Sequence, residues 1–205
     1  MDYKTVRKNA EYAFVEKKSD FIGYCAPVKT EAEAIAFVNS IKKKHSDATH
    51  NCYAYVLREG FASRFSDDGE PHGTAGMPIL DAIRKSGITD VAVVVTRYFG
   101  GILLGTGGLV RAYTAAASGA IKESEVVEVG TFTLLQLKCN YSDYQKLMPL
   151  ISSVNGRIED SDFGTDVIMT VTVRDNLADG FVADIIENTN GRVSATNVGQ
   201  KCDFV

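Results

Sequence analysis

The spacing of apolar residues changes along the chain between the period of a strand and that of a helix. Between residues 30 and 45 apolar residues recur on one helical face, and Thr30 with Glu33 three positions later forms a capping box at the start. Residues 90–99 are almost continuously apolar, which is typical of a strand covered on both faces. The other elements predicted before residue 125 are two strands within 11–28 joined by a polar turn at 17–19, a strand over 49–58, and helices over 77–86 and 107–124.

A second succession of elements begins after Glu125. It runs strand, helix, strand, strand, helix, strand, over 126–139, 142–153, 157–163, 166–174, 176–188 and 192–204. This order is that of a ferredoxin-like split βαβ unit (β-α-β-β-α-β), an architecture that many unrelated functions share. We therefore expect an α+β protein with two domains, residues 1–125 and residues 126–205.

Composition and charge narrow the class of protein. The chain has 205 residues, 45% of them apolar, and no apolar run approaches the roughly 20 residues that a membrane helix needs. Four scattered cysteines offer neither a metal knuckle nor a redox pair. Residues 1–125 carry 16 basic and 15 acidic residues, a net charge of +1, whereas residues 126–205 carry 6 basic and 11 acidic residues, a net charge of −5. The negative charge of the second half makes it a poor candidate for binding the phosphate backbone of a nucleic acid. We expect a cytoplasmic protein with no membrane contact, no cofactor and no metal.

Five glycines gather in one stretch, RYFGGILLGTGGLVRAY, between the buried strand and the helix predicted over 107–124. The first pair falls where the chain must turn after the strand, and Thr106 is placed to cap the helix. A helix start exposes unpaired N–H groups and a partial positive charge, to which anions bind readily. The candidate binding residues of this loop are Arg97, Gly100, Gly101, Thr106, Gly107, Gly108 and Arg111.

Two interpretations of this loop stay open. In the first, Arg97 and Arg111 supply positive charge beside the helix start, and the loop binds a phosphate-like anion or a partner. In the second, the glycines only permit tight turns and close packing of the helix on the sheet. No lysine follows the glycines as in a Walker sequence, so nucleotide hydrolysis of that type is not expected.

A second polar loop, SRFSDDGEPHGTAG, covers residues 63–76. Its carboxylates could hold a hard cation such as magnesium, act in acid–base chemistry or face a basic partner, or they could form a polar turn paired with arginine. The D-D-G-E spacing does not match a calcium-binding loop. The candidate binding residues of this loop are Arg64, Asp67, Asp68, Glu70 and His72.

The segments RFSDDGEPHGTAGMPIL and VVVTRYFGGILLGTGGLVRAY together resemble the signature segments of the IMPACT family, in its bacterial YigZ-type branch. The segment ATHNCYAYVLR is similar to a strand of that family, and residues 126–205 resemble the second domain of its bacterial members. The resemblance implies an N-terminal domain with a ribosomal-protein-type β-α-β-α fold, like the second domain of a small-subunit ribosomal protein and of elongation factor G. It implies a C-terminal domain similar to a late domain of that elongation factor.

The resemblance also bears on function. Eukaryotic relatives regulate translation during amino-acid starvation, by competing for the scaffold that activates a translation-factor kinase, and they carry a different accessory domain. By this likeness we expect a non-enzymatic binding protein linked to translation or its regulation. Its two glycine-bearing loops would engage a protein or RNA partner, with ribosome association as one form of that contact.

Two other interpretations remain. One is an enzyme acting on a phosphorylated or peptide-like small molecule, whose anion binds at the GTGG helix start while Asp68 or Glu70 serves as base or magnesium ligand. The other is that both loops only hold the domain together, with Arg64 and Arg97 buried in salt bridges to the acidic residues of the 63–76 loop.

Overall fold

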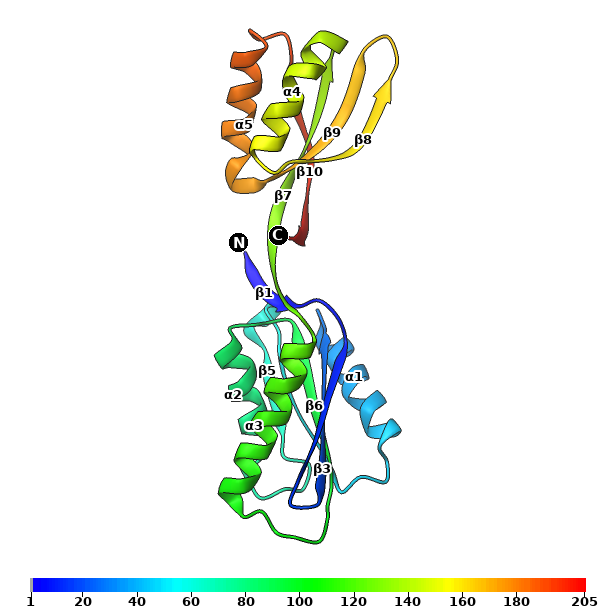
Figure 1. Cartoon of the computed structure of the whole chain (residues 1–205), viewed down its shortest axis with the longest axis vertical. Coiled ribbons are helices and arrows are strands. Elements are labelled where there is room, and N and C mark those ends of the chain that lie inside the picture. The colour runs from blue at the N-terminus through cyan, green and yellow to red at the C-terminus, as the bar shows by residue number, and fades with distance from the viewer. Residues whose placement is uncertain (1) are drawn as a thin grey trace. The chain divides into compact units, whose positions relative to one another are not determined.

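A computed structural model describes residues 2–205, which divide into two compact units (Figure 1). Residues 3–128 form the first, here called the N-terminal unit. Residues 129–205, together with Asp2, form the second, here called the C-terminal unit. Both combine helices with a β-sheet, as the α+β prediction requires.

The sheet of the N-terminal unit has five strands, and every neighbouring pair is antiparallel. In spatial order these are β2 (Ala10–Glu16), β3 (Ser19–Pro27), β6 (Val91–Tyr98), β4 (His50–Val56) and β5 (Ser63–Ser66). Helices α2 (Gly76–Ser86) and α3 (Thr106–Glu123) cover one face, and α1 (Glu31–Lys44) covers the other (Figure 1). Residues 91–95 of the central β6 are 0% exposed, which confirms that this strand is covered on both faces.

The C-terminal unit follows the predicted ferredoxin-like order. Its elements are β7 (Val126–Cys139), α4 (Tyr141–Ser153), β8 (Arg157–Phe163), β9 (Val167–Arg174), α5 (Asp175–Asn188) and β10 (Ala195–Phe204). The strands pair antiparallel in the order β10-β7-β9-β8. Leu147 and Ile151 from α4 join Phe181 and Ile185 from α5 in one core with the inward side chains of β7 and β9.

Three short elements do not appear in the sequence pattern. Residues 59–76, expected as one loop, contain a 3₁₀ turn, η1 (Glu59–Phe61), and the edge strand β5, and a further strand, β1 (Tyr3–Val6), precedes β2. The side chains of β5 are mostly exposed, so no alternation of apolar and polar residues marks it. Only pairing with β4 makes this segment a strand.

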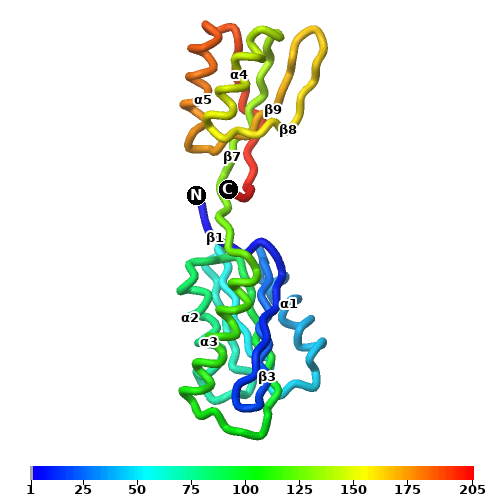
Figure 2. The backbone as a smooth tube through the Cα atoms, in the orientation of Figure 1, coloured from blue at the N-terminus to red at the C-terminus, as the bar shows by residue number. Residues whose placement is uncertain are grey.

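The β2–β3 hairpin turns at Lys17 and Lys18, whose φ angles of 47° and 65° lie in the left-handed region. Two such residues form the tight turn that matches the twist of antiparallel strands. The tip of this hairpin lies at the same end of the unit as the segment between β6 and α3 (Figure 2). This proximity determines the path of the glycine-rich loop.

A hydrogen-bonded network closes the C-terminal end of α1. The two ring nitrogens of His45, Nε2 and Nδ1, lie 2.7 Å from the hydroxyl of Tyr24 and 2.9 Å from that of Tyr98. Tyr98 donates its proton to Asp47 and Lys44 donates to Tyr24, so a neutral imidazole with its proton on Nδ1 satisfies every partner. Burial, and then the charge of Lys44, lower the pKa of His45 below its usual 6.5.

We expect this network to make stability depend on pH near neutrality. Because folding lowers the pKa of His45, the unfolded chain binds the proton more tightly than the folded chain. The contribution of neutral His45 to the free energy of unfolding is therefore full above about pH 7 and is lost as the pH falls toward the folded-state pKa. The midpoints of urea unfolding at pH 7.5 and pH 5.5 measure this loss of stability, and we expect the loss to be smaller in His45→Gln. The matched control is His72→Gln, since the His72 side chain is 98% exposed. An unchanged pH dependence in His45→Gln would contradict this assignment.

Candidate functional site

The two glycine-bearing loops meet at a cavity of about 420 Å³ at the start of α3, here called the α3 cavity. The 63–76 loop, the start of β4, the end of β6 and the first turn of α3 all contribute to its wall. Its lining residues are Thr49, His50, Gly69, Glu70, Pro71, Arg97, Phe99, Leu103, Leu104, Gly105, Thr106 and Leu109. Apolar side chains form most of the wall, and the polar groups are few, which is the usual make-up of a ligand pocket.

The first turn of α3 is capped differently from the prediction. Gly105, with φ of 73°, is the N-cap, and Thr106 is already the first helical residue, so the predicted capping role of Thr106 is wrong. The left-handed backbone at Gly105 favours glycine, which has no side chain with which to cap. Among the described residues, no side chain bonds to the N–H groups of this first turn. Gly105 and Thr106 present this end of the helix to the α3 cavity.

A buried ion pair lines the α3 cavity. Arg97 is 5% exposed, and its Nη1 donates to Glu70 at 2.7 Å. The hydroxyl of Tyr113 donates to the same carboxylate oxygen at 2.7 Å, and burial is the main cause that raises the pKa of Tyr113. Arg97 therefore does not reach outward as predicted, because its charge is neutralised by Glu70 inside the fold. Its guanidinium carbon lies 5.5 Å from the ring centre of Phe21 and 5.4 Å from that of Phe99.

One atom of this ion pair is left without a partner. The Nε of Arg97 is buried and makes no hydrogen bond to any described residue. Buried N–H groups without an acceptor are rare in native structures. Arg97, a residue that lines the α3 cavity, thus carries one unmet donor.

His50 completes the polar side of the α3 cavity. Its Nδ1 lies 2.8 Å from the carbonyl oxygen of Asp68, which can only accept, so Nδ1 carries a proton and donates it. Its Nε2 lies 3.8 Å from Glu70. His50 and Tyr113 were not among the predicted site residues. His50 comes to the site because it pairs with Arg97 in the β4–β6 register, which no local sequence signal reveals.

Asp67 holds the 63–76 loop in place. Its carboxylate accepts hydrogen bonds from the backbone N–H groups of Gly73, Ala75 and Gly76, at 2.9, 3.1 and 2.8 Å. Burial alone would raise its pKa, but these three donors outweigh burial and lower it. Asp67 therefore caps the start of α2, and its charge is used within the fold.

Asp68 is also engaged internally. It accepts a hydrogen bond from Lys42 at 2.6 Å and one from the backbone N–H of Asn51 at 2.7 Å, and despite burial these contacts lower its pKa. The role of base or magnesium ligand predicted for Asp68 in the enzyme alternative therefore has no support. Within residues 2–205, no group of three or more His, Cys, Asp or Glu side chains is placed to hold a metal ion.

The other charged residues of the 63–76 loop point to solvent. The side chain of Arg64 is 68% exposed and pairs with Glu31 at 2.9 Å, so the prediction that it is buried in a salt bridge to its own loop is wrong. His72 is almost fully exposed and lies 3.8 Å from Asp67. Neither Arg64 nor His72 lines the α3 cavity.

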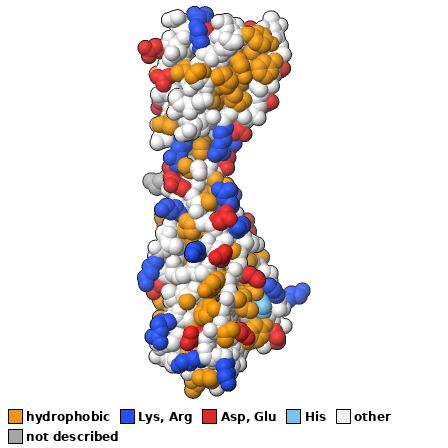
Figure 3. Space-filling view, viewed as in Figure 1, with side chains coloured by type: hydrophobic (Ala, Val, Ile, Leu, Met, Phe, Trp, Pro, Cys, Tyr) orange, Lys and Arg blue, Asp and Glu red, His pale blue; other side chains and the backbone are white. Residues whose placement is uncertain are grey.

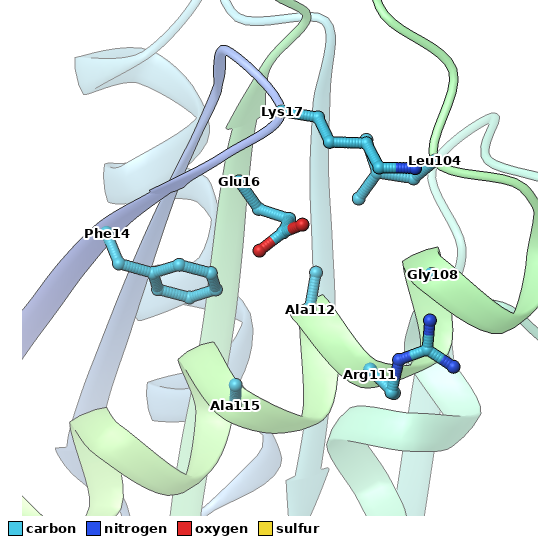
Figure 4. A pocket seen from close by; sticks show the side chains of 8 residues that line it. All are labelled: Phe14, Glu16, Lys17, Leu104, Gly108, Arg111, Ala112 and Ala115. Atoms are coloured by element: carbon cyan, nitrogen blue, oxygen red, sulfur yellow. The ribbon is translucent and has the colours of Figure 1, made fainter.

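Arg111 belongs to a different hollow from Arg97. Figure 4 shows Arg111 projecting from α3 beside Gly108, with Lys17 and Glu16 reaching across from the β2–β3 hairpin. This second cavity, of about 270 Å³, shares only Leu104 with the α3 cavity. The structure therefore does not bring the two arginines together at one anion site as predicted, because they line different cavities.

The glycines of the loop have separate tasks. A Cβ on Gly100 would lie 1.8 Å from the carbonyl oxygen of Lys18, so only glycine lets the loop pass the hairpin. The N–H of Gly100 donates to Ser19 at 3.2 Å. Gly101 has a φ of 83° and faces open space. Gly100 thus serves packing, as the second interpretation requires, and Gly105 leaves the helix start without a side-chain cap. Binding of an anion or a partner at this loop stays a prediction.

Comparisons with known proteins give matches in both halves of the chain. Residues 17–121 match the Impact N-terminal domain, and residues 137–192 match a domain of unknown function, DUF1949. IMPACT family member YvyE of Bacillus subtilis is 37% identical over 191 residues, which cover 93% of this chain and 88% of that protein. The chain belongs to the IMPACT family. IMPACT family member YigZ of Escherichia coli is 39% identical over 160 residues, 77% of this chain and 78% of that protein.

Further similarities extend across the IMPACT family. A crystal structure of a hypothetical protein is 32% identical, with a TM-score of 0.61 and coverage of 97% of this chain and 98% of that one. Protein IMPACT of Xenopus laevis is 38% identical over 96 residues, 44% of this chain but 30% of that protein. Among residues 2–205, no helix combines the length and apolar character needed to cross a membrane. These matches confirm the family that the loop sequences indicate.

Proposed function

We propose that this IMPACT-family protein is a non-enzymatic, cytoplasmic binding protein linked to translation or its regulation, which binds a protein partner at the α3 cavity. The observation that carries the proposal is the cavity itself, of about 420 Å³, with exposed apolar side chains in its wall. Leu103 is 82% exposed and Phe99 is 46% exposed. Exposed apolar groups around a hollow are typical of protein interaction sites. The link to translation rests on the likeness to eukaryotic IMPACT proteins.

The charges at the α3 cavity favour a protein over RNA. Arg97 is the one Lys or Arg among its described lining residues, and Glu70 already neutralises it. Binding to a nucleic-acid backbone depends on several Lys or Arg side chains that neutralise phosphates. Figure 3 shows hydrophobic side chains gathered among charged ones on the visible face of the N-terminal unit. Such a mixed surface suits a protein partner better than a polyanion.

The enzyme alternative receives less support. The carboxylates that it needs are engaged in the fold: Glu70 with Arg97 and Tyr113, and Asp68 with Lys42. A general base must be free to take a proton from the substrate. The site is therefore better suited to binding than to acid–base chemistry.

Leu103→Asp is expected to reduce partner capture about tenfold or more, because it places a charge on the apolar rim of the α3 cavity. The measurement uses tagged full-length protein in a lysate, followed by direct binding of the captured protein after purification. Phe61→Asp is the matched control, since Phe61 is 93% exposed and lies outside the cavity. Thermal unfolding should show that both variants remain folded. Equal capture by Leu103→Asp and wild type, or capture abolished by ribonuclease, would contradict the proposal.

A further inference from the structure

The start of α3 offers unpaired donors to whatever occupies the α3 cavity. The N-cap Gly105 brings no side chain, and no described side chain bonds to the N–H groups of the first turn. Such N–H groups, with the partial positive charge of an 18-residue helix behind them, favour a negatively charged group. Gly105 and Thr106 lie in the cavity wall, so an anion bound here is in the cavity.

A second, independent feature indicates a ligand at the same place. The side chain of Arg97 lines the α3 cavity, is 6% exposed and keeps a buried Nε without an acceptor among the described residues. An acceptor atom from a ligand would satisfy this donor. The helix start and Arg97 come from different elements, α3 and β6, yet both line the same hollow.

The balance of charge and the apolar wall define the chemistry of that ligand. Arg97 and Glu70 cancel, so the net attraction comes from one helix start, which suits a single negative charge rather than a polyphosphate. Phe99, Leu103 and Leu109 form an apolar surface next to it. A volume of about 420 Å³ lies at the small end of the range for ligand sites. The combination fits a carboxylate attached to an apolar side chain.

We infer that the α3 cavity binds the C-terminal residue of the partner protein, with the terminal carboxylate at the start of α3 and an apolar side chain against Phe99 and Leu103. The inference rests on the proposed function, that a protein partner binds at this cavity. Backbone N–H groups bind terminal carboxylates in other peptide-recognition domains. A free apolar carboxylic acid shares this chemistry, and the experiment below separates the two sources.

The test compares peptides that differ only at their last atoms. Acetyl-Gly-Ser-Gly-Ser-Leu with a free carboxylate is titrated into the full chain and followed by ¹⁵N-¹H NMR, beside the same peptide ending in an amide. We expect the carboxylate peptide to shift the amide signals of residues 105–108 and to bind about tenfold tighter or more than the amide. Tighter binding of acetyl-leucine than of the peptide would assign the site to a small molecule. Equal binding of carboxylate and amide peptides, or stronger binding of inorganic phosphate, would overturn the inference.

Thr106→Pro and Thr106→Ala form a matched pair for the helix start. Proline is favoured at the first position of a helix and removes only the N–H donor, whereas alanine keeps that donor. We expect Thr106→Pro to weaken binding of the carboxylate peptide about tenfold and Thr106→Ala to leave it within about twofold. Equal affinity of the two variants would contradict the role of this N–H group.

The two proposals fail in different ways. If Leu103→Asp abolishes capture of the natural partner while carboxylate and amide peptides bind alike, the partner uses the α3 cavity without its C-terminus. If Leu103→Asp leaves capture intact, the α3 cavity is not the partner site. In that case peptide binding would report only a small-ligand pocket.

Discussion

Replacing Glu70 with alanine is expected to lower the free energy of unfolding by about 3–5 kcal/mol, the largest effect that we predict for one substitution. The change leaves Arg97, which is 5% exposed, with a buried charge and no carboxylate. The hydroxyl of Tyr113 loses its acceptor at the same time. A buried charge cannot regain the solvation that it had in the unfolded chain, so the folded state bears the whole loss.

A double substitution separates the loss of the ion pair from the burial of a lone charge. In Glu70→Leu with Arg97→Met both charges are absent, and we expect stability to recover most of the loss, because apolar side chains of similar volume replace buried ion pairs well. Urea unfolding at pH 7.5 measures all variants, with Glu16→Ala, an exposed carboxylate, as control. A loss of less than about 1 kcal/mol in Glu70→Ala is what breaking an exposed ion pair costs, and it would contradict the role of the Arg97–Glu70 pair as a buried ion pair that stabilises the fold.

Gly100→Ala is expected to destabilise the N-terminal unit by about 2–3 kcal/mol and to displace the loop between β6 and α3. The new Cβ would lie 1.8 Å from the carbonyl oxygen and 2.1 Å from the carbonyl carbon of Lys18, which are backbone atoms that cannot rotate away. The hydrogen bond from Gly100 to Ser19 would be strained as the chains separate. Since Phe99 directly precedes this position, the wall of the α3 cavity should move with it.

Gly107→Ala is the matched control within the same loop. A Cβ there meets only the guanidinium of Arg111, at 3.6 Å, and alanine is the better helix former by roughly 1 kcal/mol. We therefore expect Gly107→Ala to be neutral or stabilising, and thermal unfolding of both variants compares them directly. Similar destabilisation by the two substitutions would show that the loop demands glycine for a reason other than its passage beside the hairpin.

Local signals were enough for most of the secondary structure. Half of the capping box predicted at Thr30 is present: Thr30 accepts from the N–H of Glu33 at 3.2 Å, whereas the Glu33 carboxylate accepts from the N–H of Lys29 at 2.6 Å. The ferredoxin-like order of the second half follows the pattern of apolar residues closely. The edge strand β5 was missed, because an exposed strand of four residues becomes one only through its neighbour. Periodicity reports burial, and an element that buries little leaves no period.

The candidate site was less predictable than the fold. Both loops were identified, and Gly69 and Glu70 of one loop meet Gly105 and Thr106 of the other around one cavity. The partners of each charge could not be known: Arg97 pairs with Glu70 across 27 positions, and Asp68 with Lys42 across 26. His50 joined the site through strand register alone. The assignment of Arg97 and Arg111 to one anion site failed because the two residues, on β6 and α3, line different cavities.

The amino-acid sequence by itself determined the family, the α+β architecture and the position of both loops, because hydrophobic period, caps and glycine spacing act over a few residues. The tertiary structure alone decided which charges are neutralised, which amides stay unpaired and which glycine is required. Those properties depend on distances between segments far apart in the chain. Two contacts show this dependence most clearly: Gly100 lies beside Lys18, and Arg97 lies beside Glu70.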